Sequence, residues 1–157
     1  MHRLSVLSSK PFETVIAAFE AAIGHPDMSV FQREMIAAKT FAELEGLVRR
    51  SVGPSGFMEF VRFNLGLVLR KESGKETPKM LRFVIGNPLV MKEMAKHVPD
   101  AASYAPVTVL IDERPDGVHL SYDTMVGFLS SYGNLHALKI AQELDSKIER
   151  LLRETAG

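Results

Sequence analysis

The segment Arg82–Pro106, RFVIGNPLVMKEMAKHVPDAASYAP, decides how this chain folds. It begins with the pattern of a β-strand, turns at Gly86-Asn87-Pro88, continues as a short helix, and ends at a second proline before another strand. Asn87 is a residue type that caps helices, and Pro88 suits the first helical turn, where a missing N–H is tolerated. The segment therefore predicts a strand, a short helix and a second strand, in that order.

The N-terminal third predicts one strand followed by helices. We expect the strand at His2–Ser8 and a helix from Pro11 to Ile23, because apolar residues there recur at helical spacing. Pro26–Gly56 is predicted to be a helical insert. Capping-box spacings at Ser29 and Thr40 indicate where its two helices begin.

Two hairpins are predicted in the middle of the chain. Phe57–Leu69 alternates in hydrophobicity, with Arg62 on the polar face, and pairs in our prediction with Met80–Ile85. Pro106–Asp112 and Val118–Asp123 flank an Asp-Gly turn signal and form the second hairpin. The residues expected on its core face are Val107, Val109, Ile111, Val118, Leu120 and Tyr122.

The C-terminal third is predicted to be a loop and a long helix. Glycines bracket the loop Gly127–Gly133, and Asn134 is placed to cap the helix that follows. Leu135 begins the apolar stripe expected to be buried along this helix. The predicted fold is a single α+β domain over residues 1–157. A mostly antiparallel sheet of four to five strands carries the N-terminal helix and the long C-terminal helix.

The composition excludes several classes of protein. Of 157 residues, 46% are hydrophobic and 24% charged, with 19 basic and 19 acidic side chains, so the net charge is zero. Nucleic-acid binders carry a basic surface that neutralises phosphates, so we expect no nucleic-acid partner. Cysteine is absent, which excludes disulfides and thiolate metal sites and suits a reducing cytoplasm. We see no signal peptide and no membrane-length apolar segment, and we expect a cytoplasmic protein.

Four short motifs resemble a known family. They are Gly86-Asn87-Pro88, Tyr104-Ala105-Pro106-Val107 before a strand, Ser121-Tyr122-Asp123, and Leu144-Asp145 on the last helix. Together they resemble the bacterial domain-of-unknown-function family 302, over nearly the whole chain. The resemblance implies a small α+β domain with a layout similar to the TATA-binding-protein-like fold, often found as a dimer. It implies no reaction, because the family has no assigned biochemical function.

Candidate site residues lie at the ends of predicted elements. Asn87 marks the start of the short helix, and two interpretations are open. The free N–H groups there could hold an anion, or the Asn87 side chain could cap the helix and satisfy those N–H groups itself. His97 lies one turn from Met94 and near Met91, a pattern that fits either a haem or copper ligand set or a packed core. With no second histidine at ligand spacing, we expect no metal and no cofactor.

A second group of candidates lies on the strands. Tyr104, Tyr122 and Asp123 stand at strand ends, with His119 nearby, and the serines of the glycine-bracketed loop lack a nucleophile-elbow motif. Arg82 and Arg62 form a further pair of candidates, since each interrupts an apolar strand. The two arginines fit either a solvated sheet face with cross-strand pairs or a polar cleft or dimer contact.

The function predicted is binding of a small, partly apolar ligand or a protein partner by a homodimer. The ligand-binding residues expected are Asn87, Tyr104, Tyr122, Asp123, His97 and Arg82. One alternative is a hydrolase- or isomerase-like enzyme that uses Tyr122, Asp123 and a histidine, and another is a purely structural, self-associating subunit.

The dimer is predicted from unprotected sheet edges and a helix surface. The expected edge strands, Phe57–Leu69 and Pro106–Asp112, carry little lysine or proline apart from Pro106. Ile140 and Leu152 form a second apolar fringe on the last helix. The alternative to a dimer is that the Pro26–Gly56 insert covers the edge within one chain.

Overall fold

The fold is a five-stranded sheet with helices on one face, in a computed structural model that describes residues 2–157. The strands occur in the order β1-β5-β4-β3-β2 and all neighbours are antiparallel. The strands are β1 (Arg3–Ser8), β2 (Met58–Asn64), β3 (Met80–Gly86), β4 (Val107–Arg114) and β5 (Gly117–Asp123). The helices are α1 (Phe12–Ala22), α2 (Met28–Ala37), α3 (Phe41–Ser51), α4 (Leu65–Ser73), α5 (Pro88–Ala95), η1 (Pro99–Ser103), α6 (Met125–Leu129), η2 (Ser130–Tyr132) and α7 (Leu135–Ala156). The predicted α+β class, antiparallel sheet and long C-terminal helix are confirmed.

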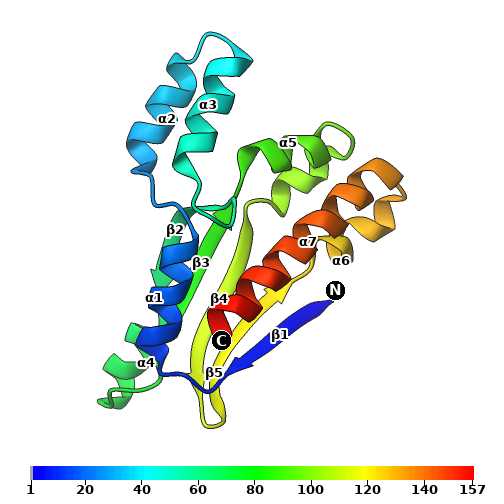
Figure 1. Ribbon diagram of the computed structural model, residues 1–157. Helices are drawn as coiled ribbons and strands as arrows, with labels where there is room; N and C mark the ends of the chain where they lie inside the picture. Colours follow the sequence, from blue (N-terminus) through cyan, green and yellow to red (C-terminus); the bar gives the residue numbers. More distant parts are fainter. Residues whose placement is uncertain (1) are drawn as a thin grey trace.

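The core lies between the sheet and helices α1, α5 and α7, which cover one face (Figure 1). Alternate residues of β4 and β5 point into it, as predicted: Val107, Val109, Ile111, Val118, Leu120 and Tyr122 are all buried. Phe19 of α1 meets Phe83 of β3 edge-to-face, with ring centroids 4.8 Å apart. The other side of the sheet carries none of these three helices, and we call it the open face.

The α7 helix begins where predicted, but its buried stripe differs at both ends. Asn134 caps it by accepting a hydrogen bond of 2.9 Å from the Ala137 amide. Leu135, expected to be buried, is 80% exposed. Leu152, expected on an exposed fringe, is fully buried because the C-terminal end of α7 packs against both α1 and β1.

A bulge in β2 reverses the predicted faces of that strand. The pairing with β3 shifts between Glu59 and Val61, so the alternation changes phase at that point. Val61 and Phe63, expected in the core, are each 42% exposed on the open face. Arg62, expected on the polar face, instead lies under the helices with its guanidinium 4.7 Å from the Phe83 ring centroid.

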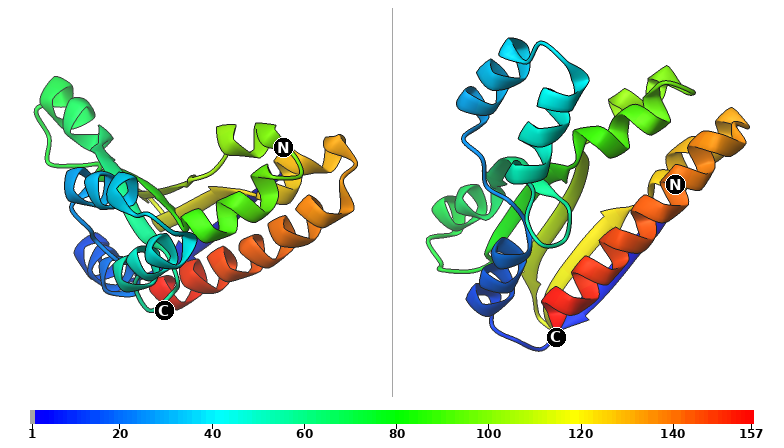
Figure 2. Two further views of the ribbon diagram at one scale, coloured as in Figure 1. Left: turned by 90° about the horizontal axis from the view of Figure 1, so that it is seen from above. Right: turned by 45° about the horizontal axis from the view of Figure 1, so that its top comes forward.

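The residues after β2 form a helix where the sequence predicted a continuing strand. Leu65–Leu69 belongs to α4, whose N-terminus is capped by Asn64 and whose C-terminus ends at Gly74 in the left-handed conformation, with φ of 71°. Alternating leucines fit either structure, but the two caps favour the helix. β2 and β3 therefore pair as predicted but are joined by α4 rather than by a polar turn. Figure 2 shows α4 projecting from the sheet on the side away from α7.

Two other predictions need correction. Asp27, not Ser29, caps α2 by accepting from the Ser29 and Val30 amides, whereas Thr40 caps α3 as expected. The segment predicted as the loop Gly127–Gly133 contains α6 and η2, because Asp145 and Thr124 bind the free amides at the start of α6.

The sheet order also decides which strands are edges. β2 is an edge strand, as predicted, but β4 is the central strand, so the Pro106–Asp112 edge was wrong and β1 is the second edge. Nothing in residues 2–157 forms a helix of the length and apolar character needed to cross a membrane.

Candidate functional site

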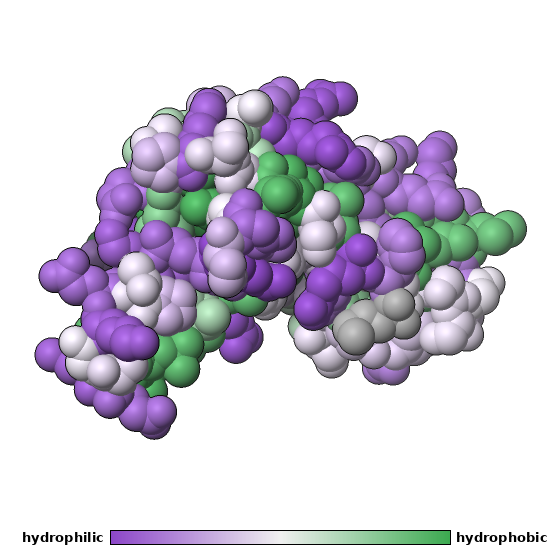
Figure 3. Space-filling model, turned by 90° about the horizontal axis from the view of Figure 1, so that it is seen from below, coloured by the Kyte–Doolittle hydropathy of each residue, from purple (hydrophilic) through white to green (hydrophobic). Residues whose placement is uncertain are grey.

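Two hollows meet at the segment that joins η1 to β4, and Ala105, Pro106 and Val107 line both of them. The first, which we call the trough, lies on the open face and has a volume of about 560 Å³. The second, which we call the apolar cavity, lies between α2 and α5 and has a volume of about 230 Å³. Figure 3 shows the lobed outline of the molecule, with a notch between two lobes.

The trough gathers four of the six predicted site residues. Arg82, Tyr104, Tyr122 and Asp123 all line it, together with apolar side chains and hydroxyl groups. The other lining residues include Arg3, Val84, Thr108, Leu110, Ser121 and Phe128. This mixture of a guanidinium, hydroxyls and apolar surface is typical of sites for small, partly apolar molecules.

Arg82 is the charged group of the trough that has no ionic partner. The other sheet arginines are paired: Arg3 with Asp123, Arg62 with Glu59 and Glu20, and Arg114 with Asp112. No carboxylate of residues 2–157 forms such a pair with Arg82, whose guanidinium lies over the Phe63 ring at 5.3 Å from the centroid. Arg62, the other candidate arginine, lies on the opposite side of the sheet, over the Phe83 ring.

Tyr104 forms an aromatic wall of the trough. Its ring stacks on Phe128 with centroids 4.6 Å apart and an interplanar angle of 6°. Its hydroxyl lies 3.1 Å from the Tyr132 hydroxyl, which donates to Asp100 at 3.0 Å. The pKa of Tyr132 is raised, first by its hydrogen bond with Tyr104 and then by loss of hydration and the bond to Asp100. The network ties the Tyr104 wall to Tyr132 and Asp100.

Tyr122 and Asp123 are adjacent in sequence but point to opposite faces of the sheet. The Tyr122 hydroxyl lies on the helix side of the sheet, where it donates to Asp145 at 2.6 Å. Tyr122 therefore lines the trough without turning its hydroxyl toward it. Burial, and next the Asp145 carboxylate, raise the pKa of Tyr122. Asp123 accepts two hydrogen bonds from Arg3, at 2.7 and 2.9 Å, and these lower its pKa.

The structure does not bring the groups of the enzyme alternative together. His119 binds Asp116 at the β4–β5 turn, and His97 is exposed and stacks on His136 with centroids 5.1 Å apart. Met94 is buried, as the packed-core interpretation predicts, and lines the apolar cavity. Among residues 2–157, no three histidine, aspartate or glutamate side chains are placed to hold a metal ion.

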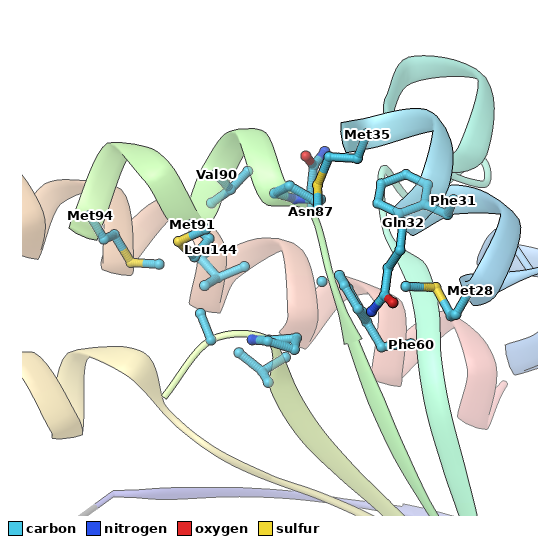
Figure 4. A pocket seen from close by; sticks show the side chains of 15 residues that line it. Met28, Phe31, Gln32, Met35, Phe60, Asn87, Val90, Met91, Met94 and Leu144 are labelled. Carbon is cyan, nitrogen blue, oxygen red and sulfur yellow. The ribbon is translucent and has the colours of Figure 1, made fainter. Parts of the chain in front are cut away.

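Asn87 lines the apolar cavity rather than the trough. Its amide oxygen accepts from the Leu89 amide at 2.9 Å, and its amide nitrogen donates to the Gly56 carbonyl at 3.0 Å. Both ends of the Asn87 amide are hydrogen-bonded within the protein, so Asn87 acts as the cap of α5. Figure 4 shows the cavity beside it, with methionine and aromatic side chains from α2 and α5 around the space.

The sequence alone did not identify several residues that contact the candidate site residues or line the two hollows. Arg3 was not assigned to Asp123, although pairing of the first strand with β5 places the two opposite each other. Asp145 was noted only as part of a motif, and its role depends on α7 crossing the end of β5. Gln32 and Phe60 of the apolar cavity gave no signal, because they meet α5 only through the tertiary fold.

Comparisons with known proteins agree with this fold. The structure is similar to the crystal structure of an uncharacterized conserved DUF302 protein from Bacillus stearothermophilus, with a TM-score of 0.67 and 11% sequence identity. The match covers 99% of this chain and 98% of that one, and at this identity it shows the fold alone. No curated protein matches the sequence. Residues 33–155 match the model of the family described as domain of unknown function DUF302, and the chain belongs to that family.

Proposed function

We propose that this protein binds a small carboxylate with an apolar body in the trough. The observation that carries the proposal is Arg82, an exposed guanidinium that has no ionic partner among residues 2–157 and lies beside a hollow of about 560 Å³. Sites for small molecules have volumes of roughly 300–1,000 Å³ and combine apolar walls with few polar groups. Tyr104 belongs to the same site as its aromatic wall.

The charge of the trough favours an anion. Its charged side chains are Arg3, Arg82 and Asp123, and the Arg3–Asp123 pair is neutral as a whole, so one positive charge is left uncompensated. A guanidinium can bind a carboxylate with two parallel hydrogen bonds. Stacking on Phe63 restricts the Arg82 side chain before any ligand binds, so less rotamer freedom is lost on binding.

The apolar body of the ligand has a defined place next to this charge. Leu110 is the cross-strand partner of Arg82, Val84 lies two residues further along the same strand, and Phe128 backs the Tyr104 ring. A ring or short alkyl chain placed there would lose contact with water while its carboxylate stays at Arg82. We therefore expect the body and the charge to contribute separately to the affinity.

The experiment is an NMR titration with 3-phenylpropionate and with 3-phenylpropan-1-ol, which share a body but differ in charge. We expect the acid to shift the Arg82 Nε signal and the backbone amides of Thr108 and Ser121, and the alcohol to bind at least about tenfold more weakly. Equal affinities, or shifts that avoid Arg82, would contradict the proposal. Failure of both compounds to bind would favour the purely structural alternative.

We further propose that the protein is a homodimer, through what we call the β2–α4 patch. The patch consists of exposed apolar side chains on an edge strand and the helix that follows it: Val61, Phe63, Leu65, Leu67, Val68 and Leu69, each between 39% and 69% exposed. A stable dimer buries about 800 Å² on each partner, and an unprotected edge strand with an apolar helix beside it suits a second copy. A cytoplasmic location also belongs to the proposal, since a chain without cysteine is at no disadvantage in a reducing compartment.

A further inference from the structure

The apolar cavity is formed by two helix stripes that face each other. Met28, Phe31, Gln32 and Met35 follow helical spacing on α2, and Asn87, Val90, Met91 and Met94 follow it on α5. α2 packs on α3 and α3 packs on α5, so α2 is held opposite α5 without closing on it. Figure 4 shows the two sets of side chains on either side of the space, with Leu144 of α7 beside Met91.

The lining of this cavity is almost entirely apolar. Met94, Leu144 and Val107 are buried beneath it, and the backbone at Pro88 and Pro106 offers no N–H group. Asn87 uses both ends of its amide within the protein. Empty apolar cavities of about 150 Å³ bind benzene-sized molecules, and the volume here, about 230 Å³, exceeds that size.

One polar group remains available, the amide of Gln32. It takes no part in the side-chain hydrogen bonds found among residues 2–157, and Figure 4 shows it extending from α2 toward Phe60. Four thioether side chains complete the lining, and such flexible side chains adapt to the shape of an apolar guest.

We propose that the apolar cavity binds a small uncharged aromatic or alkyl molecule that carries one hydrogen-bonding group, which Gln32 meets. This site adjoins the trough at Ala105–Val107 but has no charged lining residue and takes a different ligand class, so its test is independent of the carboxylate site. The size of the cavity excludes a polypeptide helix, and the lack of any charged lining residue excludes an ionic ligand.

The test uses p-cresol and toluene, which differ by one hydroxyl, and protein labelled at the methionine methyl groups. Of the eight methionines, Met28, Met35, Met91 and Met94 line the cavity, whereas Met80 and Met125 do not line it and serve as internal controls. We expect p-cresol to shift the first set and leave the second unchanged. Equal shifts in both sets would overturn the site.

Three variants then separate the parts of the proposal. Gln32→Leu should weaken p-cresol about fivefold and leave toluene unchanged. Met35→Trp should fill the cavity and remove binding of both, while Ile36→Trp, its 81% exposed neighbour on α2, should bind as the parent does. Undiminished binding by Met35→Trp, or equal weakening of both compounds by Gln32→Leu, would contradict the proposal.

Discussion

The Tyr122 hydroxyl donates a hydrogen bond of 2.6 Å to Oδ1 of Asp145, and this contact joins the central part of the sheet to α7. The same carboxylate accepts from the amides of Met125 and Val126, at 2.8 and 3.0 Å. Asp145 thus fixes the start of α6 to the sheet and to the long helix at once. α6 carries Phe128, on which Tyr104 stacks, so this contact also supports the wall of the trough.

Removing the Tyr122 hydroxyl should destabilise the fold. We expect Tyr122→Phe to lower the free energy of unfolding by about 1–3 kcal/mol, because the half-buried Asp145 carboxylate loses one of its three donors. Tyr104→Phe is the matched control. It should change the free energy of unfolding by less than about 0.5 kcal/mol, since water can replace the Tyr104 hydroxyl as the partner of Tyr132. Urea denaturation measures both. Equal losses of unfolding free energy in the two variants would show that the Tyr122–Asp145 hydrogen bond contributes no more to stability than the exposed Tyr104 contact.

The base of the α2–α3 hairpin depends on glycine. A Cβ atom on Gly24 would lie 1.9 Å from the Ser51 carbonyl oxygen, whereas one on Gly46, within α3, would be 3.6 Å from its nearest neighbour, an Arg50 nitrogen. We expect Gly24→Ala to cost about 1–3 kcal/mol of stability through steric overlap. Gly46→Ala should stabilise by up to about 1 kcal/mol through helix propensity. Thermal unfolding of the two variants gives opposite shifts if the close approach is real, and a harmless Gly24→Ala would refute it.

The Arg3–Asp123 pair predicts a small dependence of stability on pH. The pKa of Asp123 is lowered in the folded state, first by its hydrogen bonds from Arg3. The stability that this pair contributes is therefore fully present above the ordinary carboxyl pKa. It is lost as the pH falls through the lowered pKa of Asp123 in the folded state. Both side chains are partly exposed, so we expect less than about 1 kcal/mol.

The measurement is the difference in unfolding free energy between the parent and Arg3→Gln. It should be largest at neutral pH, shrink toward zero as acid protonates Asp123, and decrease in 1 M salt. A difference that stays constant from neutral to acid pH would show that the pair does not act through the Asp123 charge.

Self-association can be tested at the β2–α4 patch. Sedimentation equilibrium at micromolar concentration should give twice the monomer mass of 17.4 kDa. Val68→Lys, at a side chain that is 69% exposed, should return the monomer mass. Ile36→Lys on α2, which is 81% exposed but outside the patch, should remain dimeric. A monomeric parent would remove the dimer from the proposal.

Much of the fold could be predicted because local signals agreed with the tertiary structure. Asn87 and Asn134 cap the helices they were expected to cap, and alternation placed Val109 and Leu120 in the core. The errors occur where the sequence pattern fits two structures. Alternating leucines after Asn64 suit a strand or a helix, and the bulge before Val61 changes the face of each residue without changing the pattern.

The candidate site was only partly predictable for a related reason. The strand-end pattern singled out Tyr104 and Asp123, which both line the trough, because rigid elements present side chains to solvent there. The separation of Asn87 and His97 from the trough depends on which face each element presents, and that follows from strand order and helix packing. Arg82 was a candidate from sequence, but its lack of a carboxylate partner could be seen only in three dimensions.

The most direct test of the account is the calorimetric affinity of 3-phenylpropionate for the parent protein, for Arg82→Gln and for Arg49→Gln. Arg49 is an exposed arginine on α3, away from the trough, and controls for the loss of one surface charge. We expect Arg82→Gln to weaken binding about 10- to 100-fold, the range for losing a charge-assisted hydrogen bond, and Arg49→Gln to leave it unchanged. Equal affinities for Arg82→Gln and the parent would contradict the proposal that the trough is a carboxylate site.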